Sequence, residues 1–233
     1  MVPKIAVVRF PGSNCDLDAV QALNSFRRVN TDLVWHEDAS LAEYDAVVVP
    51  GGFSFGDYLR GGAIAARSPA LTRIAAAADQ GKPVLGICNG FQILIEAGLL
   101  PGALLRNSSL RFVCRWVNVR VESRSTRFTR KTKEGAILRL PIAHNEGRFY
   151  TSKDELKLLS KQGRVVFRYC DEQGNATPAS NPTGTEENIA GISNKQGNVV
   201  GLMPHPERAT DPLLAPNGES DGAFIFRSML EGL

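Results

Sequence analysis

The first hundred residues alternate strand-like apolar runs with helical segments, and this alternation limits the fold more than any other feature. Strands are expected at residues 4–10, 32–36, 46–50 and 84–88, and helices at residues 14–28, 63–80 and 89–97. Runs that are apolar along most of their length are typical of strands buried on both faces, as in a parallel sheet with helices on each side. The sequence therefore predicts an α/β fold with a mostly parallel central sheet and flanking helices.

The second half of the chain adds strands to this pattern. They are expected at residues 110–121, 136–143, 165–170, 189–193 and 199–203, and a closing helix at residues 223–230. In the first of these strands, Phe112, Cys114 and Trp116 share one face. The polar stretch 177–188 predicts a long surface loop, and such loops often carry function.

Length and composition favour one globular domain, residues 1–233. Hydrophobic residues make up 43% of the 233 residues and charged residues 22%, which is enough for a core of normal size. No apolar run approaches the roughly 20 residues that cross a bilayer, and the first residues lack the order of a signal peptide. We therefore expect a cytoplasmic protein without membrane contact.

The four cysteines are widely spaced and form no CxxC pair; they are Cys15, Cys88, Cys114 and Cys170. In a cytoplasmic chain this spacing argues against a disulfide framework and against a zinc site, so no metal is expected. Each cysteine is then a packing residue or a reactive thiol. Only Cys88 has the sequence context of a nucleophile, and the other three are interpreted as packing residues.

The segment Gly86-Ile87-Cys88-Asn89-Gly90 joins a buried strand directly to a helix. It is the cysteine counterpart of the G-x-S-x-G elbow, in which small flanking residues permit a sharp turn. The turn places Cys88 at a helix N-terminus, where the dipole favours a thiolate, and leaves the N–H of Asn89 free to face an oxyanion. The alternative is a buried packing cysteine, because the spacing alone is a weak motif.

A thiol nucleophile needs a base, and the base needs a group that orients it. His205 lies between two prolines, which favour an extended backbone. In an extended chain Glu207 points to the same side and can bond one ring nitrogen, which leaves the other for Cys88. The alternative is a loop histidine beside a solvated glutamate. His36 lacks such a partner, and His144 lies in a polar cluster more suited to binding.

Pro50-Gly51-Gly52 follows the strand at residues 46–50, at the end of the sheet where α/β proteins bind ligands. Glycines there let backbone N–H groups approach a substrate, and Gly52 is the candidate for a second oxyanion donor. The alternative is an ordinary glycine-rich turn. No Gly-Lys-Ser/Thr follows, so a nucleotide-binding loop is disfavoured.

Residues 106–133 contain nine Lys or Arg and one acidic residue, although the net charge of the whole chain is only +3. A nucleic-acid site would need aromatic residues on the basic face, whereas Phe112 and Trp116 have the opposite strand parity from Arg111 and Arg115. The segment is either a solvated strand face or, as we prefer, a contact surface for an acidic partner subunit. No nucleic-acid partner is expected.

The chain resembles the triad-type (class I) glutamine amidotransferases, and among them the glutaminase subunits of phosphoribosylformylglycinamidine synthase. The matching segments run along the whole chain in order: PGSNCDLD at 11–18, GGFSFGDYLRGGA at 51–63, GICNGFQIL at 86–94, GLLPGALLRN at 98–107, AHNEGRF at 143–149, NPTG at 181–184 and MPHPER at 203–208. Asn145 and Phe55 depart from the family pattern, which commonly has glycine and tyrosine at these positions.

The resemblance implies a flavodoxin-like fold and a set of roles for residues of this chain. Cys88, His205 and Glu207 would form the catalytic triad, and Gly52 and Asn89 the oxyanion hole. Gln92, His144 and Glu146 would contact the substrate, L-glutamine, which is hydrolysed to glutamate and ammonia through a thioester. The chain itself would need no cofactor.

The resemblance also implies partners. Ammonia would pass to a large synthetase subunit that uses ATP and magnesium to convert formylglycinamide ribonucleotide to formylglycinamidine ribonucleotide, ADP and phosphate in purine biosynthesis, and a small bridging subunit would complete the complex. Two alternatives stay open. One is a flavodoxin-like hydrolase or protease with another substrate, and the other is an inactive amidotransferase-like scaffold.

Overall fold

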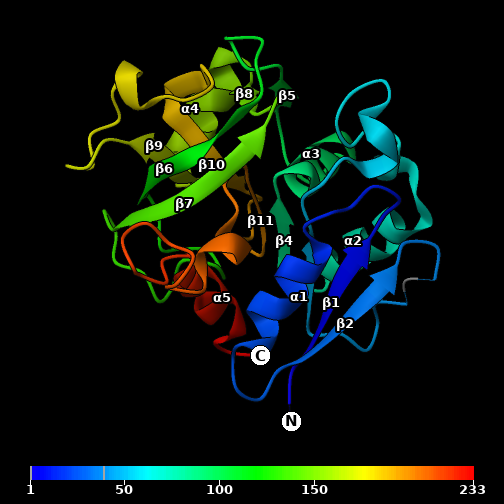
Figure 1. The fold of residues 1–233 in the computed structure, drawn as a ribbon. Coiled ribbons are helices and arrows are strands. Elements are labelled where there is room, and N and C mark those ends of the chain that lie inside the picture. The colour runs from blue at the N-terminus through cyan, green and yellow to red at the C-terminus, as the bar shows by residue number, and fades with distance from the viewer. Residues whose placement is uncertain (1, 39) are drawn as a thin grey trace.

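The computed structural model describes residues 2–38 and 40–233 (Figure 1). A nine-stranded sheet runs through it in the order β2-β1-β3-β4-β11-β10-β9-β6-β7. The first five strands in this order are parallel neighbours: β2 (Asn30–Trp35), β1 (Lys4–Arg9), β3 (Ala46–Val49), β4 (Val84–Ile87) and β11 (Val199–Leu202). The apolar residues of β1, β3, β4 and β11 are buried on both faces, whereas the edge strand β2 has no fully buried residue, and the predicted parallel sheet is confirmed.

The other half of the sheet is antiparallel and contains the strands expected in the second half of the chain. They are β10 (Ile189–Ser193), β9 (Val165–Cys170), β6 (Val113–Val121) and β7 (Ile137–His144). The sequence analysis missed a small separate sheet of β5 (Ala103–Leu105) and β8 (Arg148–Tyr150). These strands have only three residues each, too few for a periodic pattern to be visible.

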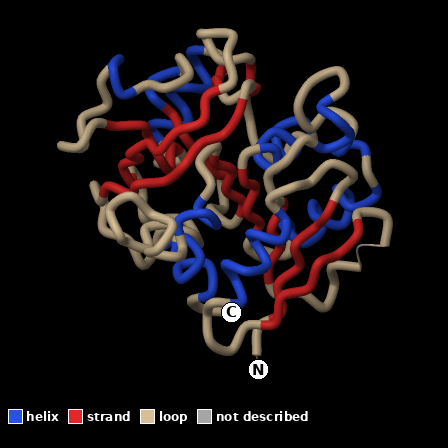
Figure 2. Tube along the Cα trace, viewed as in Figure 1, coloured by secondary structure: helices blue, strands red, loops and turns tan. Residues whose placement is uncertain are grey.

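Helices lie on both sides of the parallel strands (Figure 2). They are α1 (Asp16–Asn24), α2 (Pro69–Asp79), α3 (Asn89–Glu96) and α5 (Ala223–Leu230). A further helix, α4 (Lys153–Lys161), lies beside the antiparallel strands, and the sequence analysis did not predict it (Figure 1). The helix expected at residues 63–80 starts only at Pro69, after the 3-10 turn Ala65–Arg67. Ser68 caps α2 by accepting a hydrogen bond from the N–H of Ala70, and proline is tolerated only in a first turn.

The face of β6 that packs into the core carries valines, and the sequence analysis had not assigned this face. Val117, Val119 and Val121 are buried, whereas Phe112 is 50% exposed and Cys114 is exposed as well. Valine at every second position supplies the continuous apolar face that β6 turns to the core, and β-branched side chains pack well there.

The segment at residues 177–188 is a loop, as expected, and it supports the chain beside it. Two 3-10 turns, Pro178–Ser180 and Glu186–Asn188, shape it. Thr183 and Thr185 are buried and bond the backbone of residues 147 and 149, which holds the chain that follows β7. The polar residues here satisfy buried backbone groups, which explains their abundance without a direct role in chemistry.

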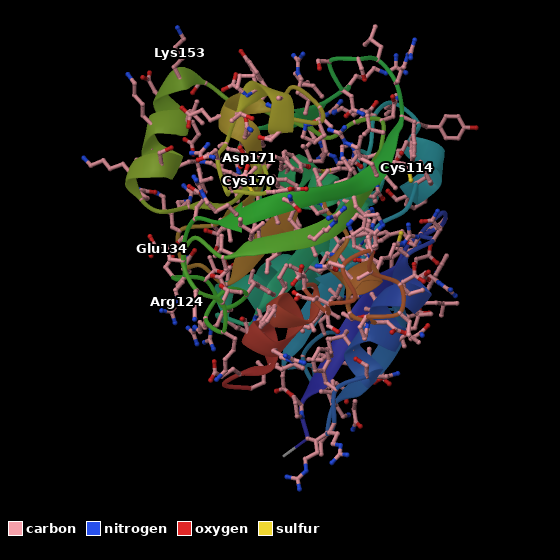
Figure 3. The ribbon with its side chains drawn as sticks, turned by 60° about the vertical axis from the view of Figure 1, so that its left-hand side comes forward. Cys114, Arg124, Glu134, Lys153, Cys170 and Asp171 are labelled. Carbon is pink, nitrogen blue, oxygen red and sulfur yellow. The ribbon has the colours of Figure 1, made fainter. Side chains whose placement is uncertain are left out.

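The basic segment at residues 106–133 does not form one compact surface. Figure 3 shows Cys114 at one end of the β6–β7 pair and Arg124 with Glu134 toward the other end. Between these ends, Arg120 is paired with Glu122 at 2.6 Å. The partner-contact hypothesis therefore concerns only the end that carries Arg124 and Arg127, where it stays a prediction. Among the described helices, none has both the length and the apolar character needed to span a membrane.

Candidate active site

Four neighbouring parallel strands end at one place in the sheet. The chain segments that leave β1, β3, β4 and β11 carry Cys15, Gly52, Cys88 and His205, and these four residues border one cavity of about 160 Å³. The remaining lining residues are Asn14, Phe53, Phe112, Ala143 and Arg208. This is the carboxyl end of the strands, beside the point between β1 and β3 where the strand order reverses, which is the usual ligand site of an open α/β sheet.

Cys88 occupies the sharp turn between β4 and α3. Its backbone has φ 50° and ψ −104°, a combination that a residue with a side chain rarely adopts, and its N–H donates to the carbonyl of Leu202 at 2.8 Å. The residue is 5% exposed and borders the cavity. A strained, fixed backbone at the mouth of a cavity is typical of a nucleophile elbow and not of a packing cysteine.

The two elbow glycines are needed because neighbouring atoms leave no space for a side chain. A Cβ at Gly90 would lie 1.9 Å from the carbonyl oxygen of Val49 in β3, and one at Gly86 would lie 2.8 Å from the oxygen of Gly90. The glycines therefore let α3 lie directly against β3 and β4. This close approach fixes the start of the helix, and with it the position of Cys88.

His205 and Glu207 form a buried pair. Nδ1 of His205 lies 2.6 Å from Oε1 of Glu207, and their side chains are 2% and 0% exposed. Burial disfavours the charged imidazolium, but the Glu207 carboxylate and the sulfurs of Cys88 and Cys15 outweigh it and raise the pKa of His205 well above its usual range. Within the described chain, His205 Nε2 has no hydrogen-bond partner.

The route by which Glu207 reaches His205 differs from the expected one. Glu207 lies in the 3-10 turn Pro206–Ala209, not in an extended chain. His205 has φ −103° and ψ 88°, and its N–H is held by the carbonyl of Pro141 in β7 at 2.8 Å. This turn brings the Glu207 carboxylate back to the imidazole of His205. The predicted His205–Glu207 contact therefore exists, but a 3-10 turn produces it rather than the alternation of side chains in an extended chain.

Gly52 borders the same cavity as Cys88, and Asn89 directly follows Cys88 in the chain. Asn89 is the first residue of α3, where N–H groups lack a partner within the helix. Gly52 borders the cavity with φ 148°, and a Cβ there would lie 2.7 Å from the N atom of Asn14. The side chain of Asn89 accepts from the N–H of Ser54 at 3.1 Å and so ties the two loops together. Both residues stay candidates for oxyanion donors.

Two of the three expected substrate contacts, Gln92 and Glu146, belong to one hydrogen-bond network. Gln92 donates from Nε2 to the carbonyl of Glu146 at 2.7 Å and accepts from Asn89 at 2.8 Å, and the Glu146 carboxylate accepts from the N–H of Gly61 at 3.0 Å. Gln92, His144 and Glu146 are not among the residues that line the described cavity. Their assignment as glutamine contacts stays a prediction.

His144 is suited to a neutral role. It is 3% exposed, and within the described chain neither ring nitrogen has a hydrogen-bond partner. Burial, with a smaller contribution from nearby His205, lowers the pKa of His144 to about 3. The imidazole is therefore uncharged at neutral pH. Of the two histidines near Cys88, only His205 has the carboxylate that a general base in a triad requires.

The sequence analysis missed the residues that complete the cavity. Cys15, judged a packing residue, borders it, and Arg208 donates from Nη2 to Cys15 Sγ at 3.3 Å. Phe53 and Phe112 line it while remaining 44% and 50% exposed. A signal was present, because Cys15 and Arg208 lie within the PGSNCDLD and MPHPER motifs. The two motifs are far apart in the sequence, so their contact could not be predicted from local patterns.

Asp57, which bonds Asn89 at 3.2 Å, gives a testable pH dependence. Burial and the nearby Glu146 carboxylate raise the pKa of Asp57 from 3.8 to about 6. The folded state therefore keeps a proton that the unfolded chain has lost, and stability falls as pH rises from about 4 to 6. We expect Asp57→Asn to raise the free energy of unfolding by about 1 kcal/mol at pH 7, after discounting for solvent screening.

Urea unfolding at several pH values measures this effect. The gain of Asp57→Asn should vanish near pH 4, where the wild-type carboxyl is protonated in the folded state. Asp38→Asn, a change at an exposed carboxyl, should produce no such pH-dependent gain. A gain of equal size at both pH values would show that ionisation of Asp57 is not its source.

Comparison with known proteins agrees with this geometry. The model of the CobB/CobQ-like glutamine amidotransferase domain matches residues 2–230. Phosphoribosylformylglycinamidine synthase subunit PurQ of Aquifex aeolicus is 53% identical over 97% of this chain and 99% of its own length, and that of Thermomicrobium roseum is 54% identical over 97% and 95%.

A solved structure gives the same result. The structure of PurLQS from Thermotoga maritima contains a chain that is 46% identical, with a TM-score of 0.86 and coverage of 99% of this chain and 98% of that one. The flavodoxin-like amidotransferase fold expected from the sequence is thereby confirmed. This chain belongs to the glutamine amidotransferases, and among them to the PurQ subunits of phosphoribosylformylglycinamidine synthase.

Proposed function

We propose that this chain is the glutaminase subunit of a phosphoribosylformylglycinamidine synthase, with Cys88 as its nucleophile. The observation that carries the proposal is the meeting of the strained Cys88 elbow with the buried His205–Glu207 pair at one cavity. An inactive scaffold would not need to hold these three groups together. The relatives' names supply the substrate class and the complex.

The reaction we propose begins with attack of the Cys88 thiolate on the side-chain amide carbon of glutamine. A C–S bond forms, and the amide oxygen becomes an oxyanion that the N–H groups of Gly52 and Asn89 stabilise. The protonated imidazole of His205 then donates to the leaving nitrogen as the C–N bond breaks. This releases ammonia and leaves a γ-glutamyl thioester on Cys88.

The second half returns the enzyme to its starting state. Neutral His205 takes a proton from water, the resulting hydroxide attacks the thioester, and the C–S bond breaks to give glutamate and the Cys88 thiolate. The proton remains on His205, ready for the next turnover. Glu207 holds Nδ1 throughout and stabilises each imidazolium stage, which agrees with the raised pKa of His205.

The mouth of the cavity supports transfer of ammonia to a partner. Phe53 and Phe112 border the cavity and are half exposed, and Tyr58 and Leu59, in the chain segment that follows Phe53, are 74% and 88% exposed. An exposed apolar rim of this kind favours a protein contact. We propose that a large synthetase subunit covers it and receives ammonia, using ATP and magnesium to form formylglycinamidine ribonucleotide, with a small bridging subunit in the complex.

Mixing the chain with its synthetase partners tests this function. Glutamate release by the isolated chain should be slow, and adding the partners should raise it about tenfold or more, because closing a site over its substrate excludes water and completes the catalytic geometry. Leu59→Ser, at an exposed leucine that does not line the cavity, should reduce this stimulation without changing the basal rate, whereas Leu213→Ser, at another exposed leucine, should not. Full activity of the isolated chain would contradict the coupling, and no glutamate release in either state would contradict the glutaminase.

A further inference from the structure

A second thiol borders the cavity, and the proposed reaction does not use it. Cys15 is 3% exposed and immediately precedes α1. Its Sγ lies 3.1 Å from Asn14 Oδ1, and Arg208 donates to the same sulfur at 3.3 Å. Its backbone N–H is fixed by the carbonyl of Gly51 at 3.2 Å. The sulfur is therefore held in place from both sides.

The sulfur of Cys15 lies against the proposed base. A Cβ at Gly51 would be 3.2 Å from Cys15 Sγ and 2.8 Å from Cε1 of His205, so the two side chains are neighbours across this glycine. One donor atom each from Cys15, His205 and Glu207 lies within 4.8 Å of the other two, and all three residues are buried. Opposite ends of the sequence thus supply a sulfur, a nitrogen and an oxygen ligand at one point.

One atom of this cluster has unused bonding capacity. Within the described residues, Oε2 of Glu207 has no hydrogen-bond partner, although it is buried, and the other oxygen of this carboxylate lies 2.6 Å from Nδ1 of His205. Leaving such an atom without a partner costs free energy, so a ligand that satisfies it is favoured. Thiolate, imidazole and carboxylate together are the ligands of zinc and similar borderline-soft divalent cations. The adjoining cavity offers an entry path and room for a water as fourth ligand.

We propose that Cys15, His205 and Glu207 form an inhibitory site for a thiophilic divalent cation such as Zn²⁺. The bound cation takes the imidazole and the carboxylate away from Cys88, so the triad is disabled while the cation is present. Binding displaces the proton of the Cys15 thiol and the proton shared by His205 and Glu207 into solvent. Affinity therefore increases with pH, because protons compete for the ligands.

This site goes beyond the proposed function and revises the expectation of no metal. That expectation considered cysteines close together in the sequence, as in CxxC pairs. Here the ligands come from the segments that follow β1 and β11, which the parallel sheet brings together. Arg208 donates to the same sulfur and competes with the cation for it, which suits a reversible inhibitor better than a permanent structural ion.

Zn²⁺ binding to the full-length Cys88→Ala variant tests the site without any need for turnover. In this variant neither the nucleophile thiol nor glutamine chemistry contributes, so failure of the glutaminase proposal would not affect the result. Competition with a chromophoric chelator should show one bound equivalent. Adding Cys15→Ser should weaken the affinity about tenfold or more, the size of loss seen even for supporting residues of metal sites.

Cys114→Ser in the same background is the matched control, because Cys114 is an exposed thiol on β6; its affinity should be unchanged. Co²⁺ added instead of Zn²⁺ should give a sulfur-to-cobalt charge-transfer band that disappears with Cys15→Ser, and thermal melting would verify that each variant is folded. Equal Zn²⁺ affinity with and without the Cys15 thiol, or no Zn²⁺ binding by the Cys88→Ala chain, would overturn the proposal.

Discussion

Replacing Cys88 by alanine is expected to abolish glutamate release from glutamine, with a loss on the order of 10⁴-fold or more, as for removal of a nucleophile from other triads. The thiolate forms the covalent intermediate, and no described side chain that lines the cavity, apart from Cys15, has comparable nucleophilicity. The removed Sγ lies at the strained turn, where alanine adopts the same backbone with no added bulk. Release of glutamate measured in the assembled complex is the direct test.

The control for this variant is synthesis with ammonia in place of glutamine. If Cys88→Ala removes only the chemistry of the thiol, the complex should still form product at high ammonium concentration. Cys15→Ala is the matched variant, since it removes the other thiol of the same cavity, and it should retain the larger part of the glutaminase activity. Glutamine-dependent synthesis by Cys88→Ala at a wild-type rate would revive the scaffold alternative.

The arrangement of elements was largely predictable from sequence. The strands at β1, β3, β4 and β11 are almost wholly apolar, and this pattern has few interpretations other than a buried parallel sheet. Which face of β6 packs into the core was left open, because Phe112 and Trp116 on one face compete with the smaller valines that are actually buried. Size of side chain is a weaker guide than an unbroken run of β-branched residues at alternate positions.

The candidate site was predictable in part, and the limit has a physical cause. Cys88 and the His205–Glu207 pair each depend on neighbours in sequence, so local patterns reveal them. Cys15 and Arg208 belong to the site only because the loop after β1 contacts the loop after β11. Local sequence patterns do not predict such a contact. The network of Gln92 with Glu146 likewise depends on tertiary approach.

Replacing His205 by glutamine is expected to lower kcat for glutamate release about 10³-fold or more, because the leaving amide nitrogen then lacks a proton donor. His144→Gln is the matched control, since His144 is also buried, lies near Cys88 and is neutral at working pH. A glutamine contact at that position would change KM more than kcat. Steady-state kinetics of both variants in the complex therefore separates the two histidines.

Replacing Glu207 by glutamine tests the charge of the pair while keeping its shape. An amide can still accept from Nδ1 of His205, but the carboxylate that raises the pKa of that imidazole is gone. Catalysis needs the thiolate and the imidazolium together, and a lower His205 pKa means that the imidazolium is lost at lower pH. The alkaline limb of kcat/KM should therefore move down by about one pH unit or more.

Glu219→Gln, at an exposed glutamate, removes the same charge elsewhere in the C-terminal segment and should leave the pH profile unchanged. A fall in rate for Glu207→Gln with no movement of the alkaline limb would mean that the carboxylate only orients the ring. Movement of the limb would mean that it also holds the proton, and the raised pKa of His205 would then be part of the mechanism. Because the buried carboxylate has no other charged partner in the described chain, the stronger electrostatic effect is the one we expect.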